Sequence, residues 1–334
     1  MLMKNKGKLS MGQSSIKSSN SSSYSGIPYN DALVKTVYLR PKSPPLGSCR
    51  RLWVKCCCGC LFQVLIIAVY IVTANVAAPL LFGLSFLEKY PKRYECRDQA
   101  TGEWRSCTRE EICARGLSKD DYRPDTNDDE YFDNWVEKYD LTCEPKMKVG
   151  LIGSMYFIGL IVFITFIPPL SDRFGRKWIL VATLVQSVVA QLGLMLTNNL
   201  YVAYFFEFLL GGTFAGRIIV GLNYVLEYNL PKLHETIVFG LLISESFTTI
   251  FITIWYEFID RGWFGLQLLC LILAILVTIF FLTYVPESPK WLYTWKFFND
   301  SRDNLAYVGK QNSLPENKLA RIRRITFDVE ILEK

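Results

Sequence analysis

Six long stretches of the chain hold almost no charged residue and alternate with polar segments. They lie at 61–88, 149–170, 178–197, 200–226, 237–258 and 263–285. Each is close to or above the roughly 20 residues that a helix needs to cross about 30 Å of hydrocarbon. Runs such as LQLLCLILAILVTIFFL (266–282) are apolar on every face and lack the alternation of a membrane β-barrel. The pattern predicts an all-α membrane protein with six transmembrane helices.

Composition agrees with a membrane protein and argues against an enzyme. The 334 residues are 51% hydrophobic, and the mean hydropathy is +0.19, which is high for a soluble domain. The sequence shows no nucleophile motif, phosphate-binding glycine loop or metal-ligand cluster, so we expect no catalytic residue, cofactor or metal. The net charge of +6 follows membrane topology and does not indicate nucleic-acid binding.

Lysine and arginine set the expected orientation, because basic residues are retained on the cytoplasmic side. Residues 1–55 hold ten of them against one acid, Asp31. We therefore expect a disordered basic cytoplasmic tail at 1–55, six helices within 56–292 and a cytoplasmic amphipathic helical segment at 293–334. The segment 89–148 would then be an extracellular loop between the first two helices. Loops of about 60 residues cross the membrane largely regardless of charge.

Four of the ten cysteines fall in this long loop: Cys96, Cys107, Cys113 and Cys143. An even number in an oxidising compartment predicts two disulfides, with all three pairings open. A zinc site is the weaker interpretation, because the loop has neither a CxxC spacing nor a histidine. Disulfides and a basic tail favour the plasma membrane or an endomembrane of the secretory route.

Five more cysteines precede the first span, at positions 49, 56, 57, 58 and 60. Cytoplasmic cysteines beside a membrane helix suit S-palmitoylation, but small apolar residues at a helix start explain them equally well. The remaining one, Cys270, lies within the sixth span and is expected to pack inertly.

Three motifs occur at related positions: NWVEKYDLTCE (134–144), LSDRFGRK (170–177) and PESPKWL (286–292). Together they resemble the N-terminal half of a major facilitator superfamily transporter, specifically the organic cation/anion transporter family, with sugar-porter-like motifs. The resemblance implies a small organic solute that binds between two six-helix halves and crosses by alternating access. Because this chain has room for one half, a second half or a parallel homodimer is expected as partner.

The chain departs from the family pattern at two positions. Pro168 replaces the first glycine of the signature loop, and Glu207 stands where the family has arginine in the fourth span. Glu227 keeps the family's acid, whereas His234 occupies the position of a basic residue. These departures favour the alternative function, a non-transporting scaffold, regulator or vestigial protein.

Polar residues inside the apolar stretches are the candidates for the substrate or ion pathway: Asn75, Glu207, Arg217 and Glu245. A charge in hydrocarbon costs about 2.5–3.5 kcal/mol on insertion scales, so each needs a cavity or a partner. Arg217 and Glu245 could form a structural pair, or an acid could face the cavity as a cation or proton site. Asn75 could line the cavity or bind a neighbouring helix, and Gly212 and Gly216 favour close helix packing.

A conformational latch is expected where the signature motifs meet. Asp172 could accept hydrogen bonds from the N-terminus of a facing helix or pair with Arg176, Gly175 permits a tight turn, and Glu287 could serve like Asp172. The gate residues are Asp172, Arg173, Gly175, Arg176, Lys177, Glu227 and Glu287. Membrane anchoring alone also explains Arg173 and Lys177.

After the sixth span, 313–334 has the pattern of an amphipathic helix. Ser313 and Glu316 have the spacing of a capping box, and Pro315 falls in the first turn. Its apolar stripe comprises Leu319, Ile322, Ile325, Val329 and Leu332. This helix could lie on the membrane, cover the bundle or bind a partner.

Overall fold

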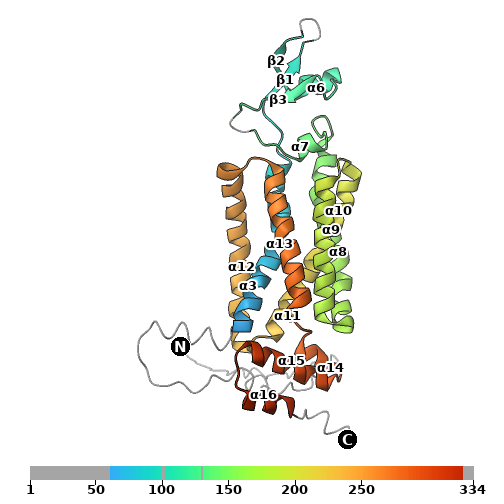
Figure 1. The fold of residues 1–334 in the computed structure, drawn as a ribbon. Coiled ribbons are helices and arrows are strands. Elements are labelled where there is room, and N and C mark those ends of the chain that lie inside the picture. The colour runs from blue at the N-terminus through green and yellow to red at the C-terminus, as the bar shows by residue number, and fades with distance from the viewer. Residues whose placement is uncertain (1–60, 99–101, 129–130, 326–334) are drawn as a thin grey trace, which may run out of the picture.

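The computed structural model describes residues 61–98, 102–128 and 131–325. Six helical spans of membrane length form a bundle, with a small β-sheet beyond one end and short helices at the other (Figure 1). We call these the sheet end, which carries 88–145, and the tail end, which carries 284–325. The predicted six spans are confirmed: Leu61–Leu87, Lys146–Phe174, Arg176–Leu196, Leu200–Glu227, Pro231–Ile259 and Trp263–Thr283.

Three predictions lie outside the described residues: the disordered tail at 1–55, the cysteines at 49–60, and the end of the apolar stripe at Val329 and Leu332.

The first span consists of three helices, α3 (Leu61–Asn75), α4 (Ala78–Phe82) and α5 (Leu84–Leu87). Pro79 explains the first break, because it has no N–H to donate to the carbonyl four residues earlier. In the last turn before the break, the Asn75 side chain donates to the Ile71 carbonyl at 2.8 Å. The break places polar backbone and the Asn75 amide at the middle of the span.

The second and third spans are α8 (Lys146–Phe174) and α9 (Arg176–Leu196), joined by Gly175 at φ +102°. Two other glycines allow α8 to lie directly against the fourth span. A Cβ on Gly159 would overlap the Phe208 carbonyl, and one on Gly211 would overlap the Tyr156 carbonyl. This close approach does not involve Pro168, which lies inside α8.

The fourth span comprises α10 (Leu200–Phe214), the π-helix η1 (Ala215–Val220) and α11 (Gly221–Glu227). A π-helical turn inside an α-helix often marks a functional site, and this one contains Arg217. Gly212 faces the Phe163 ring and Gly216 faces Thr183. The two glycines predicted to pack closely therefore do so inside this bundle.

The fifth and sixth spans are α12 (Pro231–Ile254), which continues into the π-helix η2 (Trp255–Ile259), and α13 (Trp263–Thr283). The spans differ sharply in burial. Only 17% of the apolar window of the fifth span and 22% of the second is buried, against 56% of the fourth. The faces of α8 and α12 are therefore largely uncovered.

At the sheet end, β1 (Tyr94–Arg97) pairs antiparallel with both β2 (Trp104–Cys107) and β3 (Tyr122–Pro124). The helix α6 (Arg109–Arg115) follows β2, and the Thr108 side chain caps it. The sequence did not predict this sheet. It encloses a small core that includes Tyr94 and Ile112.

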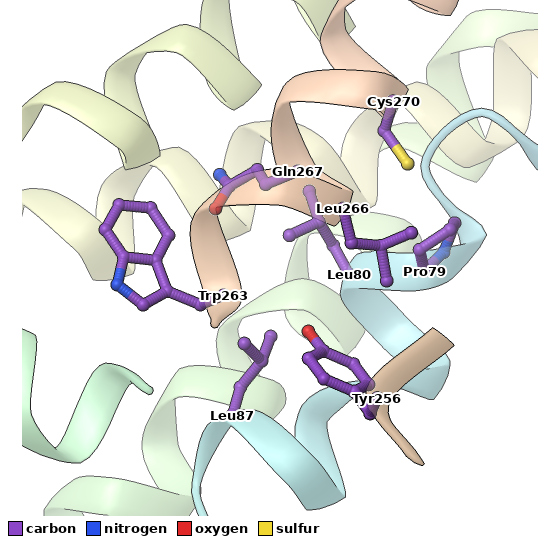
Figure 2. Close-up of a pocket in the computed structure, with 8 residues that line it drawn as sticks. All are labelled: Pro79, Leu80, Leu87, Tyr256, Trp263, Leu266, Gln267 and Cys270. Atoms are coloured by element: carbon purple, nitrogen blue, oxygen red, sulfur yellow. The ribbon is translucent and has the colours of Figure 1, made fainter. Parts of the chain in front are cut away.

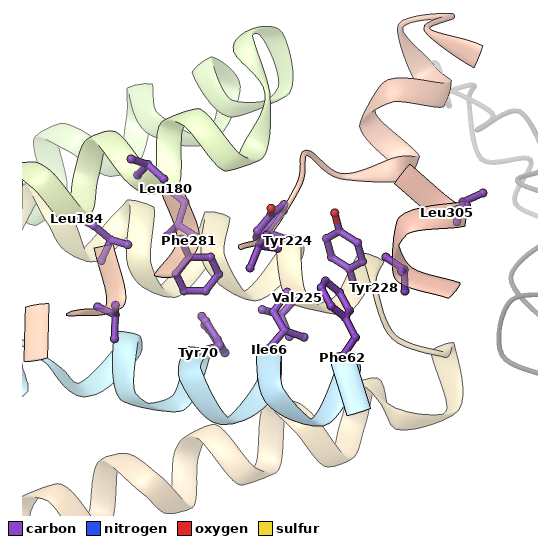
Figure 3. Packing of buried hydrophobic residues seen from close by; sticks show 14 of the residues in the cluster. Phe62, Ile66, Tyr70, Leu180, Leu184, Tyr224, Val225, Tyr228, Phe281 and Leu305 are labelled. Carbon is purple, nitrogen blue, oxygen red and sulfur yellow. The ribbon is translucent and has the colours of Figure 1, made fainter. Parts of the chain in front are cut away.

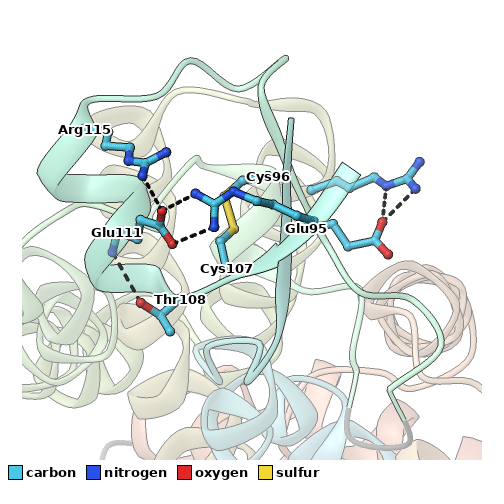
Figure 4. The surroundings of a disulfide bond; sticks show 8 residues. Glu95, Cys96, Cys107, Thr108, Glu111 and Arg115 are labelled. Atoms are coloured by element: carbon cyan, nitrogen blue, oxygen red, sulfur yellow. Dashed lines mark hydrogen bonds and ion pairs between the residues drawn. A yellow bond between two sulfur atoms is a disulfide. The ribbon is translucent and has the colours of Figure 1, made fainter. Parts of the chain in front are cut away.

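Two disulfides hold this unit together, as predicted, and select one pairing: Cys96–Cys107 and Cys113–Cys143. Figure 4 shows the first beside an ion-pair cluster in which Glu111 binds both Arg105 and Arg115, the latter at 2.8 Å. The first bond joins β1 to β2, and the second joins α6 to the segment that enters the bundle.

A short helix, α7 (Trp135–Lys138), attaches the sheet unit to the bundle. The Asn134 side chain donates to the carbonyls of Phe86 and Lys89 at the end of the first span. The Lys138 ammonium donates to carbonyls at the end of α9 and lies 3.8 Å from the ring centroid of Trp263. Burial lowers the pKa of Lys138 to about 8. The segment thus joins the ends of the first, third and sixth spans.

At the tail end, α14 (Pro289–Thr294), α15 (Phe298–Gln311) and α16 (Glu316–Arg323) close the bundle. Figure 3 shows Phe62 of α3, Tyr228 beyond α11 and Leu305 of α15 in one apolar cluster. Ile322 of the predicted stripe is also buried there. The Asn312 side chain accepts the backbone N–H of Phe62 at 3.0 Å, which caps the start of the described first span.

The capping box predicted at the start of α16 does not form. Pro315 occupies the N-cap position, and Ser313 adopts φ +56° in the turn before it. The helix α15 occupies the segment between PESPKWL and α16, within the range 293–334 that we expect to be amphipathic and helical.

Candidate functional site

Glu287 lies at the centre of a charged network at the tail end. Its Oε1 accepts the backbone N–H groups of Arg176 and Lys177 at 3.0 Å each and that of Ser288 at 2.9 Å. The carboxylate thus caps the N-terminus of α9, where the helix dipole favours negative charge. Burial raises the pKa of Glu287, and the three N–H donors oppose that rise. A Cβ on Gly175 would lie only 2.5 Å from the carboxylate, so this contact requires glycine.

The second part of the network is an ion pair between the Arg176 guanidinium and Glu227 at the end of the fourth span. Their side chains are 18% and 7% exposed, so the pair is largely removed from water. The Ser288 hydroxyl donates to Glu227, and the Lys290 ammonium lies 3.7 Å from it. Together with Glu287, these contacts join the start of the third span to the ends of the fourth and sixth.

Asp172 contributes less than its neighbours. Its carboxylate is 71% exposed and lies 3.5 Å from Arg176, so it takes the second of its two expected roles. The helix N-terminus is capped by Glu287 instead. The Asp172 backbone carbonyl accepts the indole N–H groups of Trp291 and Trp295 at 2.8 and 3.0 Å.

The other two predicted gate residues lie at the edge of this network. The Arg173 guanidinium is 5.6 Å from the ring centroid of Phe174, and the Lys177 ammonium is 5.5 Å from that of Trp178. Lys177 takes part through its backbone N–H. These side chains fit the anchoring interpretation.

Arg217 is buried at the centre of the bundle, with 1% of its surface exposed. Its Nε donates to the Thr213 hydroxyl at 3.2 Å, and a terminal nitrogen donates to the Ala74 carbonyl at 2.8 Å. Ala74 lies just before the break in the first span, so Arg217 satisfies backbone that the break leaves open. The π-helical turn and the broken helix therefore meet at this guanidinium.

The predicted pair between Arg217 and Glu245 is not formed as an ion pair within 4.0 Å in the described part of the chain. Glu245 still interacts electrostatically with Arg217, and its side chain is half-buried on α12. Glu207 lies elsewhere, on α10 nearer the sheet end, and is 1% exposed. Arg217 and Glu245 thus interact at mid-bundle without forming an ion pair, and Glu207 lies apart from them on α10.

Asn75 binds a neighbouring helix. It donates to the Ser244 hydroxyl at 2.9 Å and accepts from the Thr248 hydroxyl at 3.0 Å, which links α3 to α12. It also lines a cavity of about 410 Å³ between α3, α12 and α13, together with Phe247 and Phe251. This volume is sufficient for a small organic molecule.

A second cavity, near the sheet end, is far smaller. Figure 2 shows it between Leu87, Tyr256 and Gln267, with Cys270 on the same helix as Gln267. Its volume of about 10 Å³ is close to the minimum for one water molecule. It cannot hold a solute, and the burial of Cys270 agrees with the predicted packing role.

Two polar contacts of this site involve residues that the sequence did not single out. The Tyr228 hydroxyl donates to the carbonyls of Pro286 and Glu287 at 2.8 and 2.7 Å, and Thr213 holds Arg217. His234 lies within hydrogen-bond distance of the carbonyls of Leu226 and Asn229 and has a local role in the turn before α12. An aromatic residue with a polar tip near a helix end is the signal that could have identified Tyr228.

Sequence comparisons relate part of the chain to known proteins. Residues 144–305 match the family model of the Major Facilitator Superfamily. Mouse (Mus musculus) solute carrier family 22 member 20 is 30% identical over 195 residues, which cover 58% of this chain and 34% of that protein. Human (Homo sapiens) organic cation/carnitine transporter 2 is 25% identical over 198 residues, covering 56% and 33%. The alignments thus span about a third of each relative.

The fold has six spans of membrane length, and its residues 144–305 are similar to the Major Facilitator Superfamily. Within that class, the chain resembles the organic cation/anion transporters of solute carrier family 22, which confirms the resemblance drawn from its motifs. The matched region extends from the end of the sheet unit to α15 and includes all seven predicted gate residues.

Proposed function

We propose that this chain forms half of a transporter that moves small organic ions across a membrane by alternating access. The observation that carries the proposal is the Glu287 carboxylate on the N-terminus of α9, supported by the Arg176 and Glu227 pair. These contacts join three spans through polar groups that water can replace. They form a latch that holds the tail end closed and must open to release solute there.

The solute would bind against the uncovered faces of α8 and α12. Glu245 on α12 and Asn75, bound to α12, provide an acid and an amide near mid-bundle, and the buried Arg217 interacts electrostatically with Glu245. This mixture suits organic cations or anions and, through Asn75, sugars. A second half or a second parallel copy of this chain would cover these faces and complete the cavity.

The proposed orientation places the sheet end outside the cell and the tail end in the cytoplasm. Two disulfides at the sheet end support this arrangement, since such bonds persist in oxidising compartments. The membrane would be the plasma membrane or one derived from the secretory route. Reactivity of a cysteine placed at Glu110 or Glu235 with an impermeant thiol reagent on intact cells would test the two sides.

The alternative is a membrane protein that does not transport and acts as a scaffold or regulator. It is favoured by Glu207, which replaces a family arginine with a buried acid, and by Pro168 in the signature loop. This alternative predicts an intact fold without solute movement.

Reconstitution distinguishes the two functions. The full chain is purified, its mass in detergent is determined, and uptake of organic cations, organic anions and sugars into liposomes is measured with and without a proton gradient. We expect uptake of at least one class by a dimer. A strict monomer without uptake would contradict the proposal.

A matched pair of variants tests the latch itself. Glu287→Gln keeps the size of the side chain but weakens its hold on α9, so solute flux should change at least several-fold. Glu235→Gln alters an exposed acid near the same end of the bundle and should leave flux unchanged. Equal flux in both variants would show that Glu287 is not part of a gate.

A further inference from the structure

Glu207 is a buried acid for which the transport mechanism has no use. Its side chain is 1% exposed, and its Oε1 has no hydrogen-bond partner. No ion pair joins it to a lysine or arginine in the ranges that the structure describes. A carboxyl group in this state needs a physical explanation, because a buried ionised carboxylate without a partner is among the most costly groups in a protein.

The face of α10 that carries Glu207 is lined by apolar residues. Ala203 and Leu210 lie four residues before and three after it, on the same face of α10. Both belong to the apolar cluster that fills the sheet half of the bundle with Leu194, Tyr139 and others. Glu207 therefore projects from the face that packs into this cluster.

The titratable groups near Glu207 are acids and phenols. Glu88 at the end of α5, Tyr139 of the α7 segment and Tyr156 of α8 interact with it electrostatically. The Tyr139 hydroxyl donates to the Leu194 carbonyl, and phenols ordinarily stay neutral below about pH 10. Lys138, next to Tyr139, directs its ammonium to the end of α9. None of these groups offers Glu207 a positive charge.

We propose that Glu207 is a proton-binding site, a carboxyl group held neutral inside the bundle that exchanges its proton with the sheet end through Glu88. Protonation removes the charge that the apolar cluster cannot accommodate. In the exchange, a proton from water first binds the Glu88 carboxylate. It then passes to an ionised Glu207, which restores the charge on Glu88.

Glu88 is suited to this relay. It follows α5 at the sheet end, outside the spans, and its Oε1 is also buried without a hydrogen-bond partner. Burial raises its pKa to about 7, so it can take up and release protons near neutral pH. The proposal goes beyond transport and holds whether or not the chain moves a solute, since its readout is protonation.

The first test is the thermal unfolding midpoint of the purified full chain between pH 5 and pH 8, as tryptophan fluorescence reports it. A proton held only in the folded state makes the wild type less stable as pH rises. Glu207→Gln is neutral at every pH, so relative to it the wild type should lose about 3 °C per pH unit. Glu257→Gln, an exposed acid of η2 at the same end, should behave like the wild type.

Two results would overturn the proposal. Parallel pH profiles of the wild type and Glu207→Gln would show that Glu207 does not hold a proton. Stabilisation by sodium or potassium chloride, but not by choline chloride, that is lost in Glu207→Gln would make it a metal-cation site.

Infrared spectroscopy of the wild type provides a measurement that does not depend on the folding of a Glu207 variant. At pH 7 we expect the carbonyl stretch of a protonated carboxyl group in an apolar site, shifted in heavy water. The band should remain in Glu88→Gln, with slower exchange in heavy water. Its absence from the wild type would refute the neutral carboxyl group.

Discussion

The two ends of the bundle treat buried acids in opposite ways. At the tail end, Glu287 accepts three backbone N–H groups and Glu227 binds the Arg176 guanidinium. One oxygen of each tail-end acid, Glu227 Oε1 and Glu287 Oε2, also lacks a hydrogen bond, but Glu227 Oε1 lies in the ion pair and Glu287 holds its donors through Oε1. At the sheet end, Glu207 and Glu88 each have a buried Oε1 without a hydrogen-bond partner, and Glu207 forms no ion pair in the described residues. The tail end therefore offers N–H donors and a guanidinium to its carboxylates, whereas Glu207 is buried without either, the state for which we propose a neutral carboxyl group.

This contrast separates two physical roles. Acids held by charged or N–H partners form contacts that can break and re-form, which suits a gate. Acids held by apolar burial respond to the proton concentration, which suits a proton site. The contrast is testable, because removing charge should be costly at the tail end and nearly harmless at the sheet end.

The largest effect is expected for Glu287→Ala. This change leaves the N–H groups of Arg176, Lys177 and Ser288 without their acceptor, and we expect a loss of about 3 kcal/mol in the free energy of unfolding. Unfolding titration in mixed micelles measures it. Glu287→Gln retains an acceptor oxygen and should lose about half as much.

Glu235→Ala is the control for that measurement, because Glu235 is an exposed acid near the same end. Its free energy of unfolding should stay within about 0.5 kcal/mol of the wild type. Equal losses of unfolding free energy in Glu287→Ala and Glu235→Ala would show that the contacts of Glu287 do not stabilise the tail end.

The second largest effect is expected for the ion pair of Arg176 and Glu227. Because their side chains are largely removed from water, a double-mutant cycle with Arg176→Gln and Glu227→Gln should give a coupling free energy of about 1–2 kcal/mol. The same titration in mixed micelles measures the four proteins. Additive losses would show that the pair is not coupled, and Glu227 would then need another explanation for its burial.

The pattern of the sequence predicted the six spans because each is a nearly continuous apolar run. An apolar run of this length rarely forms anything other than a membrane-spanning helix. The pattern could not predict the hydrogen bond between Arg217 in the π-helical turn and the Ala74 carbonyl, because the two residues are 143 positions apart. Local pattern carries no information on such a pair. The sheet at 94–124 was missed because its strands have three or four residues each.

The site was predicted in its composition and less well in its contacts. The motifs identify Glu287, Glu227 and Arg176, but they leave open whether Asp172 or Glu287 caps a facing helix. The structure places Asp172 on the surface and Glu287 at the helix start. Whether Asp172 or Glu287 reaches the N-terminus of α9 depends on how the sixth span packs against the third. The residue spacing within each motif gives no information on that packing.

The third largest effect is expected for Glu88 at the sheet end. Burial raises the pKa of Glu88 to about 7, above its value of about 4.3 in an unfolded chain. The folded state therefore holds the proton more tightly, and the resulting stability is present below about pH 4 and lost as pH rises through 7. Because the side chain is only partly buried, Glu88→Gln should gain about 1 kcal/mol relative to the wild type between pH 4.5 and 8.

Unfolding titrations at a series of pH values measure this gain, with Glu257→Gln as the control. A gain of the same size in the control would assign the pH dependence to general charge repulsion. If Glu88→Gln did not raise the free energy of unfolding, water would reach Glu88 freely. Glu88 would then not be the group that passes protons to Glu207.

The smallest effect is expected for Asp172→Asn, and it distinguishes the observed network from the one that the motif alone suggests. The Asp172 carboxylate is 71% exposed and 3.5 Å from Arg176, so its loss should change the free energy of unfolding by no more than about 0.5 kcal/mol. Its backbone carbonyl, which holds Trp291 and Trp295, is unaffected by the substitution. The same mixed-micelle titration compares it with Glu287→Gln. If Asp172→Asn were as costly as Glu287→Gln, the signature-loop acid would share the helix N-terminus, and the tail end would hold two interchangeable caps where the structure shows one.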